Sequence, residues 1–161
     1  GPCQLISDTK YGDGIMPIDT YKKTVDELVG PNLEFDLDWE LLRTMLKKYG
    51  IRHSTLMANA PYGSSSMVSN STPGAEPPRD LINSKKGVTK VVPDYAKVGK
   101  YYTTAWGPDF NNVSYFKFLA VIQKFEDQTI SVNQYVNLIL TGGKVKKSSL
   151  IEDVLTARYY G

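Results

Sequence analysis

The residues best suited to chemistry lie in one short stretch, 61–66 (PYGSSS), which follows a predicted strand and leads into a predicted helix start. A loop in that position exposes backbone N–H groups, which together with the helix dipole form an anion site suited to a phosphate. The three serines add hydroxyl donors, while Gly63 lets the backbone approach a ligand closely. Since the loop contains no Lys or Arg, the residues predict recognition by backbone and hydroxyl groups.

The same serines have a second interpretation, because Ser is a favoured residue at the N-terminus of a helix. Most Ser-rich helix starts are only caps, so the residues alone leave both interpretations open.

Other residue types that carry chemistry are scarce. Cys3 is the only cysteine and His53 the only histidine, which excludes an internal disulfide, a zinc finger and a Cys–His nucleophile pair. A lone cysteine cannot supply the dithiol that two-electron redox chemistry needs. We expect His53 to be a structural or surface residue, and we expect no metal site and no catalytic residue in this chain.

Length and composition place the chain among ordinary globular proteins. It has 161 residues, of which 41% are hydrophobic and 22% charged, and its formal net charge is +2. This length suits one domain with a real core, and this charge favours neither nucleic acid nor an anionic membrane as a partner. No apolar run approaches the roughly 20 residues of a membrane span, and no signal peptide is visible. We expect a cytoplasmic α/β protein that is not a complete enzyme.

Periodicity and capping residues predict the elements that position the loop. Asp38 is the expected N-cap of a helix that ends at Gly50, and Asn112 that of a later helix. The predicted helices are 17–28, 38–50, 64–70, 94–106, 112–125 and a last one from Ser148 or Ser149; the predicted strands are 54–59, 129–136 and a hairpin over 80–92 that turns at 85–87.

Two of these elements carry further expectations. The helix at 112–125 is apolar nearly all round, which predicts burial. The strand at 129–136 has one polar face, which either lines a cavity or is half-exposed. We also expect an apolar stripe along the helix at 38–50, and we expect the apolar residues of the last helix to face a core.

Nine ordered stretches resemble one family, the large catalytic (alpha) subunit of class I ribonucleotide reductase. They span nearly the whole chain: 16–23 (MPIDTYKK), 38–43 (DWELLR), 50–56 (GIRHSTL), 61–66 (PYGSSS), 69–72 (SNST), 76–79 (EPPR), 91–95 (VVPDY), 123–128 (QKFEDQ) and 155–157 (LTA).

The resemblance implies the C-terminal portion of a ten-stranded α/β barrel, incomplete without partner fragments. It implies one segment over residues 1–161, with a helical lead-in at 1–53, a strand and phosphate loop at 54–79, and a hairpin, helices and barrel strand at 80–161. The last helix ends flush at Gly161, which we also take as a sign of truncation.

The resemblance also implies the reduction of ribonucleoside diphosphates to deoxyribonucleoside diphosphates, for deoxyribonucleotide biosynthesis and DNA replication. The loop Pro61, Tyr62, Gly63, Ser64 and Ser65 matches the family loop that binds the substrate's phosphates. The sequence departs from the family at Tyr62, often a small hydroxyl residue there, and at Gly63, often a carboxylate or alanine. Ser64 and Ser65 are the matching contacts.

Several parts of the family's machinery have no counterpart in this chain. The finger loop with the radical cysteine, the two redox cysteine pairs and the allosteric regions are missing, and Cys3 lies in no finger-loop context. Tyr159 and Tyr160 precede the position of the family's radical-transfer tyrosine pair. We therefore expect no cofactor bound by this chain, a radical-bearing metal cofactor in a separate beta subunit, and thioredoxin or glutaredoxin as reductant.

Three hypotheses follow. In the first, the chain is a fragment of a split alpha subunit, inactive alone and active only with the other alpha fragments and the beta subunit. In the second, it is a non-catalytic nucleotide-binding or interaction module derived from that subunit. In the third, it is an excised fragment.

Overall fold

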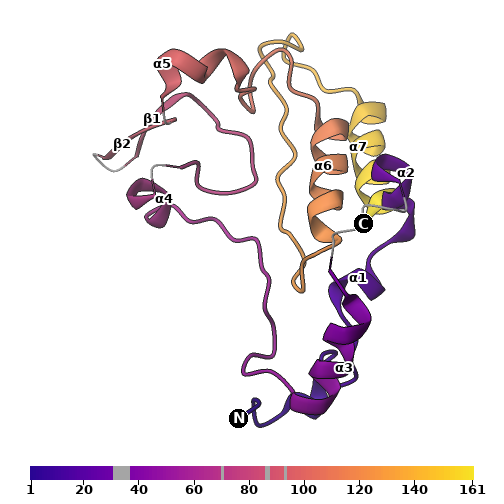
Figure 1. The fold of residues 1–161 in the computed structure, drawn as a ribbon. Helices are drawn as coiled ribbons and strands as arrows, with labels where there is room; N and C mark the ends of the chain where they lie inside the picture. Colours follow the sequence, from indigo (N-terminus) through magenta and orange to yellow (C-terminus); the bar gives the residue numbers. More distant parts are fainter. Residues whose placement is uncertain (31–36, 70, 86–87, 93) are drawn as a thin grey trace. The chain divides into compact units, whose positions relative to one another are not determined.

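The computed structural model describes residues 1–30, 37–69, 71–85, 88–92 and 94–161, and short helices joined by long irregular segments dominate it (Figure 1). In chain order the elements are η1 (Ile6–Asp8), α1 (Pro17–Thr20), η2 (Lys23–Val25), α2 (Asp26–Val29), α3 (Trp39–Tyr49), α4 (Ser65–Val68), β1 (Ile82–Lys85), β2 (Val88–Val91), α5 (Tyr95–Val98), η3 (Gly99–Tyr101), α6 (Asn112–Gln123) and α7 (Lys147–Tyr160).

The chain forms two compact units, each built from segments that are distant in the sequence. The terminal unit contains residues 1–58, 116–130 and 156–161, and the loop unit contains residues 59–115 and 131–155. The candidate phosphate loop lies in the loop unit. The segment boundaries expected after residues 53 and 79 stay a prediction.

Two predicted helices differ in outcome because of their local partners. The helix that Asp38 was expected to cap is confirmed as α3: the Asp38 carboxylate accepts a hydrogen bond from Leu41 N at 2.8 Å, and Gly50 follows with a φ of 65°. The helix expected over 17–28 is instead broken into α1, η2 and α2. Tyr21 is extended there, and its hydroxyl donates to the Asp26 carboxylate at 2.7 Å.

The helix expected over 94–106 ends early. Only α5 and η3 form, and Tyr102 is already extended. Further on, Ala105 N donates to Pro78 O at 2.9 Å, a bond that a continuing helix would not allow. Pro93, which was expected to open the helix, lies outside the described residues.

The predicted strands at 54–59 and 129–136 are wrong for this structure, which assigns no strand to either segment. A strand needs a neighbouring backbone along its length, and here side-chain bonds accompany a backbone bond from Asp127 N to Met57 O. In the terminal unit, the Asp127 carboxylate accepts hydrogen bonds from Leu56 N and Met57 N, both at 2.8 Å. In the loop unit, the Asn112 side chain bonds the backbone of Tyr135.

The predicted hairpin is confirmed: β1 and β2 pair antiparallel, with Ile82 opposite Val91 and Lys85 opposite Val88. Its turn residues 86 and 87 lie outside the described residues. Among the described residues, this is the whole of the sheet.

The predicted burial of the 112–125 helix is largely confirmed. On α6, Tyr115, Phe116, Leu119 and Ala120 are buried, although Phe118 is 55% exposed. The predicted cap is off by one residue, because the side chain of Asn111, not that of Asn112, accepts the hydrogen bond from Ser114 N.

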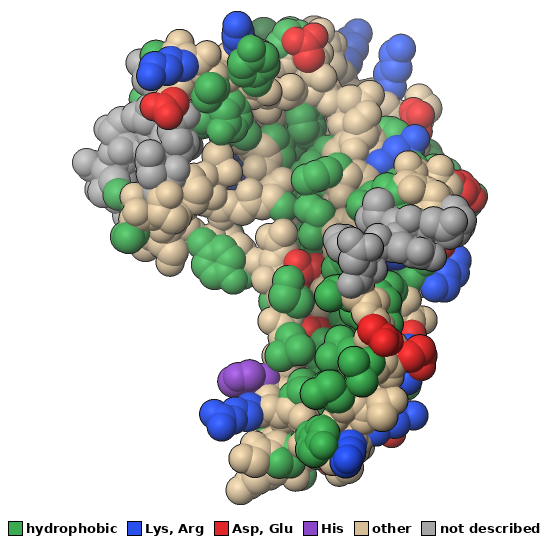
Figure 2. Space-filling view, viewed as in Figure 1, with side chains coloured by type: hydrophobic (Ala, Val, Ile, Leu, Met, Phe, Trp, Pro, Cys, Tyr) green, Lys and Arg blue, Asp and Glu red, His purple; other side chains and the backbone are tan. Residues whose placement is uncertain are grey.

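The apolar residues of α7 do not face a core as expected, and the apolar stripe of α3 is largely exposed. On α3 only Leu46 is buried, and it packs with Tyr11 and Met16. Figure 2 shows hydrophobic side chains on the surface over α3. The exposed apolar residues of the two helices, each between 41% and 62% exposed, are Leu41, Leu42, Met45, Tyr49, Ile151, Val154, Leu155 and Tyr159.

The start of α7 also differs from expectation. The helix begins at Lys147, and Ser149 N donates to Lys146 O, so neither Ser148 nor Ser149 is its cap. Its buried residue is Asp153, because that carboxylate accepts hydrogen bonds from Asn112 and Gln134. Within the described part of the chain, no helix combines the length and the apolar character needed to cross a membrane.

Candidate functional site

The candidate phosphate loop is closed by backbone hydrogen bonds within the loop unit. Tyr62 N donates to Pro73 O at 2.8 Å, so the chain turns back on itself between these residues. Ser66 N donates to Tyr62 O at 3.0 Å, which leads the loop into α4, a single helical turn (Figure 1). The base of the loop is thus held while its tip remains at the surface.

The tip presents hydroxyl groups to solvent. Residues 61–65 are all exposed. Ser64 occupies the N-cap position of α4, yet its side chain makes no capping hydrogen bond, which contradicts the interpretation of this serine as a plain cap. Among the described residues, neither the Ser64 nor the Ser65 hydroxyl has a hydrogen-bond partner. Both hydroxyls are therefore available to a ligand.

The third serine has a different role from the one expected. Ser66 is buried, with only 5% of its surface exposed. Its hydroxyl donates to Gly63 O at 3.2 Å. Ser66 supports the backbone of the loop from inside. Its burial depends on tertiary packing, and the run of three serines offered no signal for it.

The segment that follows the loop carries a polar cluster. Asn133 Nδ2 donates to Glu76 Oε1 at 2.5 Å. Tyr135 is buried; burial raises the pKa of its hydroxyl, Glu76 raises it further, and Arg79 acts in the opposite direction. The hydroxyl makes no hydrogen bond of ordinary geometry with any described residue. The Asn133–Glu76 hydrogen bond connects the 76–79 stretch to the 131–137 segment.

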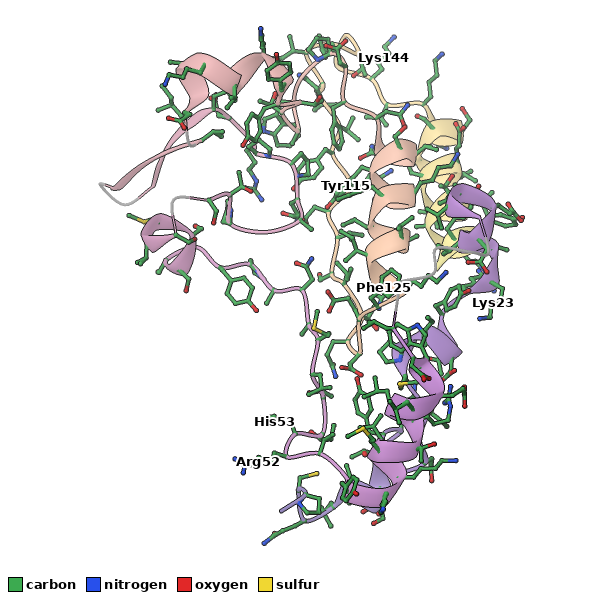
Figure 3. All side chains as sticks on the ribbon, viewed as in Figure 1. Lys23, Arg52, His53, Tyr115, Phe125 and Lys144 are labelled. Carbon is green, nitrogen blue, oxygen red and sulfur yellow. The ribbon has the colours of Figure 1, made fainter. Side chains whose placement is uncertain are left out.

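Aromatic rings pack beside this cluster. The ring of Tyr135 lies edge-on to Trp106 at 5.4 Å and to Phe110 at 5.6 Å between centroids. Tyr115 of α6, labelled in Figure 3, lies 6.3 Å from Tyr135, and burial followed by the charge of Glu76 raises its pKa. The Tyr135 side chain is therefore fixed by packing rather than by its hydroxyl.

The polar face predicted over 129–136 is exposed at Thr129, Ser131 and Asn133. Asn133 bonds Glu76, and just past the predicted strand Asn137 Nδ2 donates to Trp106 O at 2.6 Å. Of the two interpretations left open, a cavity-lining face and a half-exposed one, the contacts support an exposed segment with side-chain partners.

The remaining candidates stand apart from the loop. His53 is exposed, as expected of a surface residue, and Figure 3 shows it with Arg52 on the segment that follows α3. Cys3 is partly buried in the terminal unit. Within the described residues, no group of three His, Cys, Asp or Glu side chains could hold a metal ion.

The comparison with protein families decides what kind of chain this is. The barrel-domain model of the ribonucleotide reductase family matches residues 1–97, which include the whole candidate loop. The chain belongs to the ribonucleotide reductase family.

Relatives extend the similarity to the full chain. It is 46% identical to a ribonucleoside-diphosphate reductase subunit alpha from Buchnera aphidicola, 41% identical to the ribonucleoside-diphosphate reductase 1 subunit alpha from Escherichia coli, and 40% identical to the ribonucleoside-diphosphate reductase subunit alpha of Enterobacteria phage T4. In each case the whole of this chain is covered, but only 21% or 22% of the relative. The chain thus spans about a fifth of the length of these reductase subunits.

The family resemblance expected from the nine sequence stretches is confirmed. The barrel name applies to the family, whereas the described residues of this chain contain two short strands in one hairpin. In this reductase-family chain, the exposed Ser64 and Ser65 hydroxyls are the features that the geometry marks as free to bind.

Proposed function

We propose that this chain supplies the substrate phosphate-binding loop of a ribonucleotide reductase alpha subunit that reduces ribonucleoside diphosphates. The observation that carries the proposal is the pair of exposed Ser64 and Ser65 hydroxyls on a loop closed at Tyr62 and Pro73, in a chain of this family. Relatives that cover the whole chain are named ribonucleoside-diphosphate reductase subunits.

In this proposal the loop binds and orients the diphosphate and transfers no proton. Ser64 and Ser65 donate hydroxyl hydrogen bonds to phosphate oxygens. Pro61, Tyr62 and Gly63 hold the two serines in place, and the Tyr62 N–H is already donated to Pro73 O. Because no Lys or Arg lies in the loop, the donors are neutral. Neutral hydrogen bonds contribute about 0.5–1.5 kcal/mol each, so the loop favours correct placement of the substrate more than tight binding.

The proposal requires the rest of the subunit. The segments 54–59 and 129–136 form no strand among the described residues, and a barrel strand needs neighbouring strands, which this proposal assigns to the rest of the subunit. The exposed apolar faces of α3 and α7 are further surfaces for neighbouring parts to cover. The partners are the other parts of the alpha subunit and a radical-generating beta subunit.

Reduction itself must use groups outside this chain. A single cysteine cannot provide both a thiyl radical and a redox pair, so we propose that the isolated chain is inactive. The radical-bearing metal belongs to the beta subunit in this proposal, and electrons come from thioredoxin or glutaredoxin.

Substitution of the two serines tests the loop assignment. In the reductase that contains this chain, the double variant Ser64→Ala/Ser65→Ala should raise the KM for diphosphate substrates about 5- to 150-fold, from two lost hydrogen bonds of about 0.5–1.5 kcal/mol each. Ser148→Ala, at an exposed serine on α7, is the matched control. A double-alanine variant with wild-type KM for every diphosphate would refute the assignment.

A separate experiment tests the need for partners. The chain alone should self-associate or unfold without cooperativity, and co-expression with the remaining alpha and beta polypeptides should give a soluble complex. A cooperative monomer that binds nucleoside diphosphate but none of those polypeptides would instead support a non-catalytic module.

A further inference from the structure

The stretch 133–135 is held in place by side chains from two helices. Asn112 of α6 donates from Nδ2 to Tyr135 O at 2.8 Å and accepts from Tyr135 N at 3.0 Å, the two bonds that a neighbouring strand would form. Asp153 of α7 accepts hydrogen bonds from Asn112 at 3.0 Å and from Gln134 at 2.6 Å. With the buried Tyr135 ring packed among aromatic neighbours, this stretch forms a firm support within the loop unit.

One side chain of this support bonds the segment 73–78, which follows the phosphate loop and which we call its stem. Asn133 donates to the Glu76 carboxylate, and Glu76 follows Pro73, whose carbonyl closes the loop, by three residues. A second tie holds the same stem two residues later, where Ala105 N donates to Pro78 O at 2.9 Å. Loss of the Asn133 bond would therefore leave the stem bonded at Pro78 but free the part of it between Pro73 and Glu76, next to the loop.

We propose that Asn133 is a positioning residue for phosphate binding, acting through Glu76 on the loop that carries Ser64 and Ser65. The inference rests on the proposed function of that loop. Since only α4, a single turn, gives the loop regular structure, its ordering upon ligand binding costs conformational entropy. A stem fixed in advance reduces that cost, so Asn133 should affect substrate affinity rather than turnover.

A reversal of the hydrogen bond tests this role. In the reductase that contains this chain, Asn133→Asp faces the Glu76 carboxylate with a second carboxylate, and the KM for diphosphate substrates should rise about 3- to 10-fold with kcat nearly unchanged. Adding Glu76→Gln restores a donor and an acceptor in the opposite order, and the KM should return to within about 2-fold of wild type. Hydrogen exchange of the Tyr62 amide should be faster in Asn133→Asp and restored in the double variant.

Asn137→Asp is the matched control, because Asn137 is two residues further along and bonds the backbone carbonyl of Trp106. Its KM should stay at the wild-type value. The positioning role is overturned if Asn133→Asp leaves the KM unchanged while Ser64→Ala/Ser65→Ala raises it, or if Glu76→Gln fails to rescue a raised KM. If the serine variant itself leaves the KM unchanged, the proposed function of the loop fails first.

Discussion

Lys124 and Asp26, 98 residues apart in the sequence, form an ion pair in the terminal unit with Nζ and Oδ1 3.0 Å apart. The Lys124 side chain is only 3% exposed, and its ammonium group lies 4.4 Å from the centroid of the Tyr21 ring. Burial lowers the pKa of Lys124, but the Asp26 carboxylate and Tyr21 outweigh this effect and leave the pKa raised. The lysine therefore stays charged inside the unit and ties α2 to the end of α6.

Removing the counter-charge of Lys124 should destabilise the chain more than removing the buried ammonium group itself. Asp26→Asn leaves the buried ammonium group without its counter-charge, whereas Lys124→Met replaces it with an apolar chain of similar length. We expect Asp26→Asn to lower the Tm by several degrees, and by more than Lys124→Met does. Glu40→Gln is the control, because the Glu40 side chain is 81% exposed in its pair with Arg43 and should have little effect. Thermal melts followed by circular dichroism measure the three variants, and the reverse order would contradict the explanation.

Acid should destabilise the terminal unit through two carboxylates. Hydrogen bonds from Arg43 hold the pKa of Asp19 below its ordinary value of 3.8, and those from Tyr21 and then Lys124 do the same for Asp26. A lowered pKa adds stability that is complete above the ordinary value and is lost as pH falls through the folded-state value. The urea concentration at the unfolding midpoint should therefore decrease as the pH is lowered below 3.8. In the variant Asp19→Asn/Asp26→Asn this part of the decline should disappear; an unchanged decline would exclude these carboxylates as its cause.

Two adjacent carboxylates should have opposite effects on stability. Glu126 Oε2 is buried without a partner among the described residues, and burial and then Asp127 raise its pKa above the ordinary 4.5. A raised pKa gives stability that is present below 4.5 and is lost as pH rises through the folded-state value. Glu126→Gln should therefore stabilise the chain at pH 7 and have little effect below pH 4.5.

Asp127→Asn is the matched comparison at the neighbouring position. It weakens the hydrogen bonds from Leu56 N and Met57 N and should destabilise by about 1–3 kcal/mol. Urea denaturation at both pH values measures the two variants, and a loss of stability in Glu126→Gln at pH 7 would show that its carboxylate has a stabilising partner.

Asn112 should contribute more to stability than its neighbour Asn111. Asn112→Ala removes three hydrogen bonds, to Tyr135 N, Tyr135 O and Asp153, and should cost about 2–3 kcal/mol. Asn111→Ala removes the cap of α6 at Ser114 N and should cost about 1 kcal/mol. Equal losses in urea denaturation would mean that the Tyr135 segment does not depend on Asn112.

Short-range features of this chain were predictable from residue types alone. Asp38 caps α3 and Gly50 ends it, because capping depends on residues within one turn. The β1–β2 hairpin likewise follows from alternating residues around a short turn. The position of the Pro61–Ser65 loop and the family of the chain were also evident from local motifs.

Contacts between residues that are distant in the sequence determine the other features of the fold. The segments at 54–59 and 129–136 have the residue pattern of strands, but a strand forms only where another backbone lies alongside, and in this structure Asp127 and Asn112 bond them instead. Asp153 is buried on α7 in place of its apolar neighbours, because its partner Asn112 lies 41 residues away.

The candidate site divides in the same way. Residue types placed hydroxyl donors at 64–66, whereas packing separated exposed Ser64 and Ser65 from buried Ser66. The Asn133–Glu76 bond joins residues 57 positions apart, so no local pattern could predict it. Capping and turns depend on neighbours along the chain, while burial and support of a loop depend on which distant segments the folded chain brings together.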